Sequence, residues 1–227
     1  MTKPLPLQIH SQTLWASAGR SLYWEEDASL IVSDLHFGKT GHFRKSGIPV
    51  PPKVNREDLQ RLVVELVYFG ARKLILTGDL FHSEENLEWD HFRRWRDSLP
   101  VEEFILVRGN HDILKTPAYA SMGIRVQEKS LSMNPFRFTH DPQEQSDASR
   151  DLYTIAGHWH PGIRLTGMGK QSLRLPCFYF TQKWGVLPAF SRFSGLAQVE
   201  PAQAKHVIAI LPAEPRSGGS PSLIALK

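Results

Sequence analysis

The sequence predicts an α/β fold in which a sheet with parallel strand pairs carries helices on its faces and packs on a second sheet. Three apolar, β-rich runs, at residues 29–36, 73–79 and 103–112, each lead into a polar cluster. Helical patterns separate these runs, and the order strand, helix, strand is typical of a sheet with parallel pairs. After residue 170 short β-like runs follow without a clear helix, which predicts the second sheet.

Two amphipathic patterns predict the helices between the three runs. Apolar residues spaced i, i+3, i+4 and i+7 form one face within residues 59–66, with Asn55 as the N-cap and Gly70 as the C-terminal stop. A second helix is predicted to open at Ser83 and to close at Pro100, with Phe, Trp and Leu on its inward face.

The later strands are shorter and less regular. They are predicted in "FRFTHD" (136–141), "YTIAGHWHPG" (153–162), "SLRLPCFYF" (172–180), "WGVLPAF" (184–190) and "HVIAIL" (206–211). Neither an internal repeat nor a clean boundary is visible, so we expect a single domain over residues 1–227.

Composition places the chain among soluble globular proteins, with 41% hydrophobic and 22% charged residues. No apolar run approaches the length that spans a membrane, and the N-terminus lacks the apolar segment of a signal peptide, so the cytoplasm is expected. A single cysteine, Cys177, excludes an intrachain disulfide and a cysteine metal cluster. The net charge of +4 is compatible with a polyanionic substrate.

Five polar clusters stand at or near the ends of predicted strands, where the ligand crevice of an open α/β sheet lies. They are Asp34-x-His36, Gly78-Asp79, Gly109-Asn110-His111-Asp112, His140 and Gly157-His158-x-His160. Each is weak alone, because such short motifs are frequent by chance. As an ordered set of carboxylate, amide and imidazole groups, however, they predict a metal site.

Spacing adds to this prediction. Side chains two residues apart point to one side of an extended chain, so Asp34 and His36 form a pair, as do His158 and His160. Each pair could bind one ion or contact two. Mixed carboxylate, amide and imidazole ligands suit Mn, Fe, Zn, Co or Ni rather than Mg or Ca alone.

In this order the clusters resemble the signature of the calcineurin-like metallophosphoesterases, DxH, GDxx, GNH(D/E), H and GHxH, over residues 34–160. The resemblance implies a four-layer αββα sandwich, with two mixed β-sheets flanked by helices. It also implies a hydrolase that cleaves phosphoesters by attack of a hydroxide held between two divalent metal ions, with manganese as the expected metal.

The resemblance further implies a role for each residue. One metal ion would be held by Asp34, His36, Asp79 and His160. The other would be held by Asp79, Asn110, His140 and His158, with Asp79 bridging the two. His111 would act on the substrate phosphate as an acid or charge stabiliser, and Asp112 would orient it.

The segment "FGKTGHFRKSG" follows the first ligand pair directly, so it must leave the rim of the metal site. Its cations Lys39, Arg44 and Lys45 are predicted to contact substrate phosphates, as cations that follow a phosphate backbone do.

A narrower resemblance concerns the substrate. "LYWEEDASLIVSDLHFGKTGHFRKSGIPVP", with the later "GDLFHS", "GHWHPG", "LRLPCF" and "LPAF", is similar to the bacterial ligase-associated DNA damage response endonucleases (PdeM-type) over most of residues 14–196. This implies a nuclease that cleaves phosphodiester bonds in DNA repair, in functional association with a DNA ligase, an exonuclease and a helicase.

Two other functions are compatible with the same motifs. A small-molecule phosphodiesterase or phosphatase that acts on nucleotides would use the same metal site. The segment between Asp112 and Phe136 is short and polar, which argues against a lipid substrate. A non-catalytic metal-binding scaffold is the third reading, and the presence of every expected ligand in the sequence argues against it.

Overall fold

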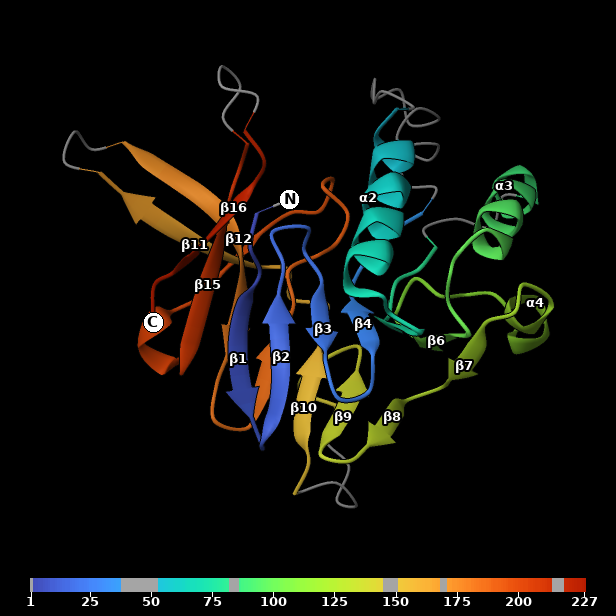
Figure 1. The fold of residues 1–227 in the computed structure, drawn as a ribbon, viewed down its shortest axis with the longest axis horizontal. Coiled ribbons are helices and arrows are strands. Elements are labelled where there is room, and N and C mark those ends of the chain that lie inside the picture. The colour runs from blue at the N-terminus through green and yellow to red at the C-terminus, as the bar shows by residue number, and fades with distance from the viewer. Residues whose placement is uncertain (1, 38–52, 82–85, 145–150, 168–170, 214–218) are drawn as a thin grey trace.

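The computed structural model describes residues 2–37, 53–81, 86–144, 151–167, 171–213 and 219–227 (Figure 1). Within these ranges the first sheet has seven strands in chain order. They are β1 (Leu5–Ile9), β2 (Gln12–Ala16), β3 (Leu22–Trp24), β4 (Ser29–Val32), β5 (Lys73–Thr77), β6 (Glu103–Val107) and β7 (Arg125–Gln127). Strands β4 to β7 pair in parallel, whereas β1 to β4 pair antiparallel, so the sheet is mixed.

The second sheet is also mixed and runs in the order β14-β11-β12-β13-β10-β9-β8, with β15 beside β12 and β16 beside β15. Its strands are β8 (Ser130–Met133), β9 (Phe136–Thr139), β10 (Tyr153–Ala156), β11 (Pro161–Thr166), β12 (Ser172–Phe180), β13 (Trp184–Val186), β14 (Ala197–Gln198), β15 (His206–Leu211) and β16 (Ser222–Ala225). Strand β10 is parallel to β9 and β13, and the other pairs include antiparallel ones.

The helices join the parallel strands of the first sheet. Helix α2 (Lys53–Phe69) lies between β4 and β5, α3 (Asn86–Asp97) between β5 and β6, and α4 (Thr116–Ser121) between β6 and β7 (Figure 1). A short 3-10 helix, η2 (Pro201–Gln203), precedes β15. The predicted α/β class with two mixed sheets and helices is confirmed. None of the described helices is long and apolar enough to cross a membrane.

Alternation along the parallel strands builds two hydrophobic layers from the first sheet. Ile31, Ile75 and Ile105 pack into the cluster that includes Phe136 and other residues of the second sheet. Neighbours such as Leu30 and Leu74 point the other way, into the cluster beneath the helices. Because both faces are covered, β4 is buried throughout, as is usual for parallel strands.

The predicted helices are present with shifted starts. Helix α2 begins at Lys53, so Asn55 lies inside its first turn and the N-cap prediction is wrong. A cap contributes only about 1 kcal/mol, and the buried face of the helix outweighs it. Gly70 follows the last helical residue with φ +61°, as predicted for a stop. Helix α3 lies within the predicted range and ends at Asp97, and the predicted opening residue, Ser83, is outside the described ranges.

Candidate metal centre

Loops that leave the strands of both sheets meet at one end of the molecule. Asp34 and His36 follow β4, Asp79 follows β5, residues 109–112 follow β6, and His140 follows β9. The first two loops are joined along their backbones, because Asp34 N donates to Gly78 O at 3.2 Å and His36 N donates to Asp79 O at 2.9 Å. The carboxyl-end placement expected for an open α/β sheet is therefore observed.

Backbone conformation at the site differs from the expectation of an extended chain. Asp34, His36, Asp79, His158 and His160 all have positive φ, between 47° and 66°. The prediction that each Asp or His pair lies on one side of an extended strand is therefore wrong in its geometry. Left-handed residues turn the chain sharply instead, and a non-glycine residue adopts this conformation only where its surroundings hold it there.

Asp34 is fully buried and lies among imidazole groups. Its Oδ1 is 3.3 Å from His160 Nε2, and its Oδ2 accepts hydrogen bonds from Ser33 Oγ and from His158 N, the latter at 3.1 Å. Burial by itself would raise the pKa of Asp34, but the close approach of His160, with His140 and Ser33, holds this pKa below its ordinary value. Asp34 is thus held as a carboxylate.

Asp79 occupies the centre of the cluster. Its Oδ1 is 3.6 Å from His140 Nε2, and its Oδ2 is 3.9 Å from His36 Nε2 and 4.0 Å from His111 Nε2. The same Oδ1 accepts a hydrogen bond from His111 N at 2.9 Å. A carboxylate with imidazoles on both oxygens is suited to contact two ions, which is the bridging role predicted for it.

His140 and His158 lie against each other on the side of the second sheet. Nδ1 of His140 is 3.0 Å from Thr77 O, so that nitrogen carries the proton and Nε2 is left to accept. Nδ1 of His158 lies 3.0 Å from this Nε2. Burial alone lowers the pKa of His140, but the carboxylates of Asp34 and Asp79 raise it above its usual value.

Two groups of ligand atoms are close enough to hold a metal ion, each with all atoms within 4.8 Å of one another. They are Asp34, His36 and His160, and Asp34, Asp79 and His140. Among the described residues Asp34 Oδ1 is buried and accepts no well-aligned hydrogen bond. Carboxylate oxygens and imidazole nitrogens that converge in this way are ligand types that first-row divalent ions prefer, so the donor set fits such ions.

Asp112 holds two of the loops together. Its carboxylate accepts backbone hydrogen bonds from Asp79 at 2.8 Å, Leu80 at 3.0 Å and Gly109 at 2.8 Å. Burial, together with the nearby charge of Asp79, raises the pKa of Asp112 to about 6, although the backbone hydrogen bonds that it accepts oppose the shift. Asp112 therefore acts on His111 by fixing the backbone of the loop that carries it.

Two glycines allow the loops to approach each other. Gly78 has φ +88°, and a Cβ there would overlap the His140 ring. A Cβ at Gly157 would lie 2.6 Å from Asp34 Oδ2 and would also overlap Ser33. Any larger residue at either position would push a predicted ligand out of place.

The remaining predicted residues lie either at the edge of the site or outside the residues that the structure describes. Asn110 and His111 are exposed, with 48% of the His111 side chain accessible. Lys39, Arg44 and Lys45, predicted to contact substrate, lie outside the described residues. No role at the site was predicted for Ser191, whose N donates to Asp34 O at 3.2 Å. Its only sign in the sequence was the run "LPAF" just before it.

Comparisons with known proteins agree with this geometry. The sequence profile of the calcineurin-like phosphoesterases matches residues 29–192. The crystal structure of the nuclease MPE from Pseudomonas putida superposes with a TM-score of 0.76 and 28% sequence identity, over 91% of this chain and 96% of that one.

A structure from Aquifex aeolicus, described as a protein of unknown function, AQ665, gives a TM-score of only 0.41. Its identity is 19%, over 58% of this chain and 78% of that one, and it supports no argument. No curated protein matches the chain in sequence.

Proposed function

Because the chain belongs to the calcineurin-like phosphoesterase family and is therefore a hydrolase of phosphoester bonds, we propose that it cleaves phosphodiester bonds of DNA with two divalent metal ions. One observation carries the proposal: the carboxylates of Asp34 and Asp79 lie close to several imidazoles. These imidazoles belong to His36, His140 and His160, and His158 lies against His140. The fold-level likeness to a bacterial nuclease supports the choice of a nucleic acid.

The proposed ligands divide between two ions that share Asp79. One ion would be held by Asp34, His36, Asp79 and His160, and the other by Asp79, Asn110, His140 and His158. Manganese is the proposed metal, and Fe, Zn, Co or Ni would suit the same ligands. When bound, the two ions lower the pKa of a water molecule and offset negative charge on the phosphoryl group.

The side chains then have separate tasks. Asp34 and Asp79 supply the negative charge that attracts the ions, while Thr77 O keeps His140 in the tautomer whose Nε2 faces the site. His111, whose exposed ring lies 4.0 Å from Asp79, hydrogen-bonds or protonates the phosphoester oxygens. Asp112 orients His111 by fixing the loop on which it sits. Lys39, Arg44 and Lys45 would contact flanking phosphates.

The biological setting is proposed from the same resemblances. A nuclease with this site would act in DNA repair, in functional association with a DNA ligase, an exonuclease and a helicase. We also propose that residues 1–227 form a single domain.

Purified protein with Mn, incubated with labelled DNA, cyclic nucleotides and a generic chromogenic phosphodiester, tests the proposal directly. We expect cleavage of DNA and of the generic diester, and loss of both in Asp79→Asn. The matched control is Asp97→Asn, at the exposed end of α3, which should retain wild-type rates. Cleavage of cyclic nucleotides but not of DNA would instead support a small-molecule phosphodiesterase, and inactivity on all three would support a scaffold.

A further inference from the structure

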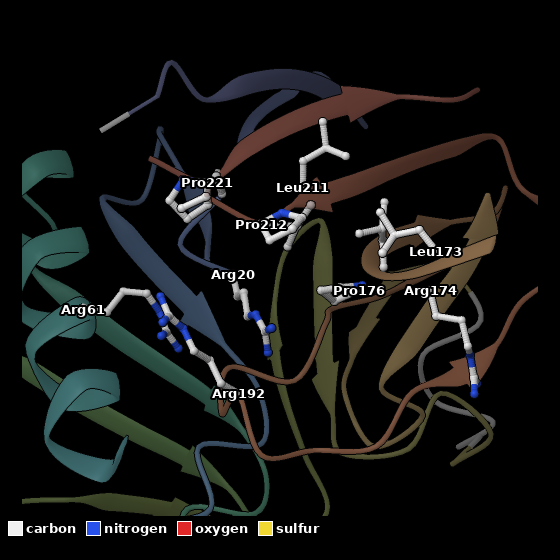
Figure 2. Close-up of a pocket in the computed structure, with 13 residues that line it drawn as sticks. Arg20, Arg61, Leu173, Arg174, Pro176, Arg192, Leu211, Pro212 and Pro221 are labelled. Carbon is white, nitrogen blue, oxygen red and sulfur yellow. The ribbon is translucent and has the colours of Figure 1, made fainter. Parts of the chain in front are cut away.

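Apart from the metal centre, a hollow of about 440 Å³ lies between α2 and the strands β12 and β15 (Figure 2). None of its lining residues is a predicted metal ligand. Four arginines line it, whereas no Asp or Glu does. The other lining side chains are apolar, mainly leucines, prolines and alanines. Its volume is within the range of about 300–1,000 Å³ that is usual for small-molecule sites.

One of the four arginines is a structural wall of this hollow. Arg61 pairs with Asp58 at 2.8 Å and donates through Nε to Gly19 O at 3.1 Å. It also donates to Phe190 O, and its guanidinium lies 4.3 Å from the centre of the Phe190 ring. Its charge is paired with Asp58, and its Nε and Nη2 donate to backbone carbonyl groups, so Arg61 holds the wall rather than a ligand.

Arg20 and Arg192 are different, because no described carboxylate forms an ion pair with either guanidinium. Arg20 Nη1 donates only to neutral acceptors, Ala189 O at 3.1 Å and Ser191 O at 2.9 Å. Arg192 is exposed, and its backbone N rather than its side chain contacts Asp58, at 3.3 Å. Burial, with the charges of Arg61 and Arg192, lowers the pKa of Arg20 to about 10, so it remains a cation at neutral pH.

The wall of the hollow is continuous with the metal centre. Phe190 N donates to Ser33 O at 2.7 Å, and Ser191 N donates to Asp34 O at 3.2 Å. The segment whose carbonyl groups are held by Arg20 therefore also holds the backbone of a predicted metal ligand. Arg192 directly follows Ser191, so it lies one residue along the chain from a backbone contact of Asp34.

We propose that Arg20 and Arg192 form an anion subsite for a phosphate group of a nucleic-acid strand whose neighbouring diester lies at the metal centre. Two guanidiniums that form no ion pair with a described carboxylate supply the attraction, and planar N–H donors suit phosphate oxygens. The apolar lining is suited to the sugar and base. This proposal rests on the proposed function. A free nucleotide would offer the same phosphate chemistry.

Binding of a labelled single-stranded oligonucleotide, followed by anisotropy across a salt series, tests the subsite. The Asp79→Asn background keeps the strand intact in Mn. Loss of one phosphate contact lowers the salt slope by about 0.7, or about fivefold in affinity at 0.1 M salt if the lines meet at 1 M. We expect this change in Arg192→Gln and a loss of affinity in Ala213→Glu, which adds a carboxylate to the lining.

The matched control is Arg125→Gln, at the start of β7 and thus at the opposite ends of the parallel strands from the metal centre. It should bind as the background protein does. A second arm measures the rise in Tm with thymidine monophosphate in the wild-type holoenzyme. A rise that Arg192→Gln abolishes, with oligonucleotide binding unaltered, would assign the subsite to a free nucleotide and overturn the strand assignment.

Equal oligonucleotide binding in all variants, with no nucleotide effect on Tm, would overturn the subsite altogether. Because the binding arms do not require cleavage, a wild-type protein that fails to cut DNA would count against the proposed function alone.

Discussion

Backbone strain and metal-binding chemistry fall on the same residues, namely Asp34, His36, Asp79, His158 and His160. Each has a positive φ without being glycine, a conformation that costs on the order of 1–3 kcal/mol. Backbone bonds such as those from Ser191 N and His36 N hold these turns in place. The left-handed turns therefore point these side chains into the site, whereas an extended chain would point them in other directions.

His111→Ala is expected to separate chemistry from metal binding. The His111 ring is exposed at the rim with its Nε2 4.0 Å from Asp79 Oδ2, and its backbone N donates to Asp79 Oδ1. Loss of a proton-transfer group should lower kcat by about 10²- to 10⁴-fold. Metal content, measured by elemental analysis after reconstitution, should stay at the wild-type value. Loss of metal together with activity would make His111 a ligand and contradict its proposed role.

At the scale of elements, helix α2 connects the first sheet to the segment around Phe190 and Ser191, which contacts the backbone of Asp34. Arg61 reaches Gly19 O and Phe190 O. One turn along, Glu65 is buried and accepts a hydrogen bond from Ser21 Oγ at 2.6 Å. Polar groups that face inward from this helix thus tie together segments that are far apart in the chain.

Glu65 provides a pH test of this arrangement. Burial raises its pKa above the ordinary value of 4.5, although Ser21, Ser17 and Arg61 oppose the shift. A raised pKa means that the neutral carboxyl is favoured in the folded state, so its contribution is complete below pH 4.5 and is lost as pH rises through the folded-state pKa. Glu65→Gln keeps the acceptor for Ser21 and removes the titration.

The Tm of Glu65→Gln, relative to wild type, should therefore increase from pH 4 to pH 8. Glu102→Gln, which changes an exposed carboxylate ahead of β6, is the control and should show no such trend. A constant Tm difference across this range would mean that Glu65 does not titrate with folding.

At the scale of the whole molecule, the metal centre joins the two sheets. Asp34 and Asp79 come from the first sheet, and His140 and His158 from the second. Ions bound between them should stabilise the packing of one sheet on the other, since a ligand at 100 times its Kd adds about 2.7 kcal/mol. Chelation should accordingly lower the Tm, and added Mn should restore it.

Metal analysis of the reconstituted protein should approach two ions per chain. His140→Ala and His158→Ala should each lower this content towards one and reduce the Tm gain from Mn. Unchanged metal content and activity in both variants would show that the proposed second ion is wrong.

The sequence by itself determined the α/β class, the helical faces and the residues that gather at the site, because periodicity and strand-end polar clusters are local properties of the chain. Only the tertiary structure decided how those residues meet. The left-handed turns at Asp34 and Asp79, the support of Asp34 by Ser191, and the convergence of Arg20 with Arg192 all depend on segments brought together by packing. Such long-range contacts arise from burial across two sheets, for which no short stretch of sequence carries a pattern.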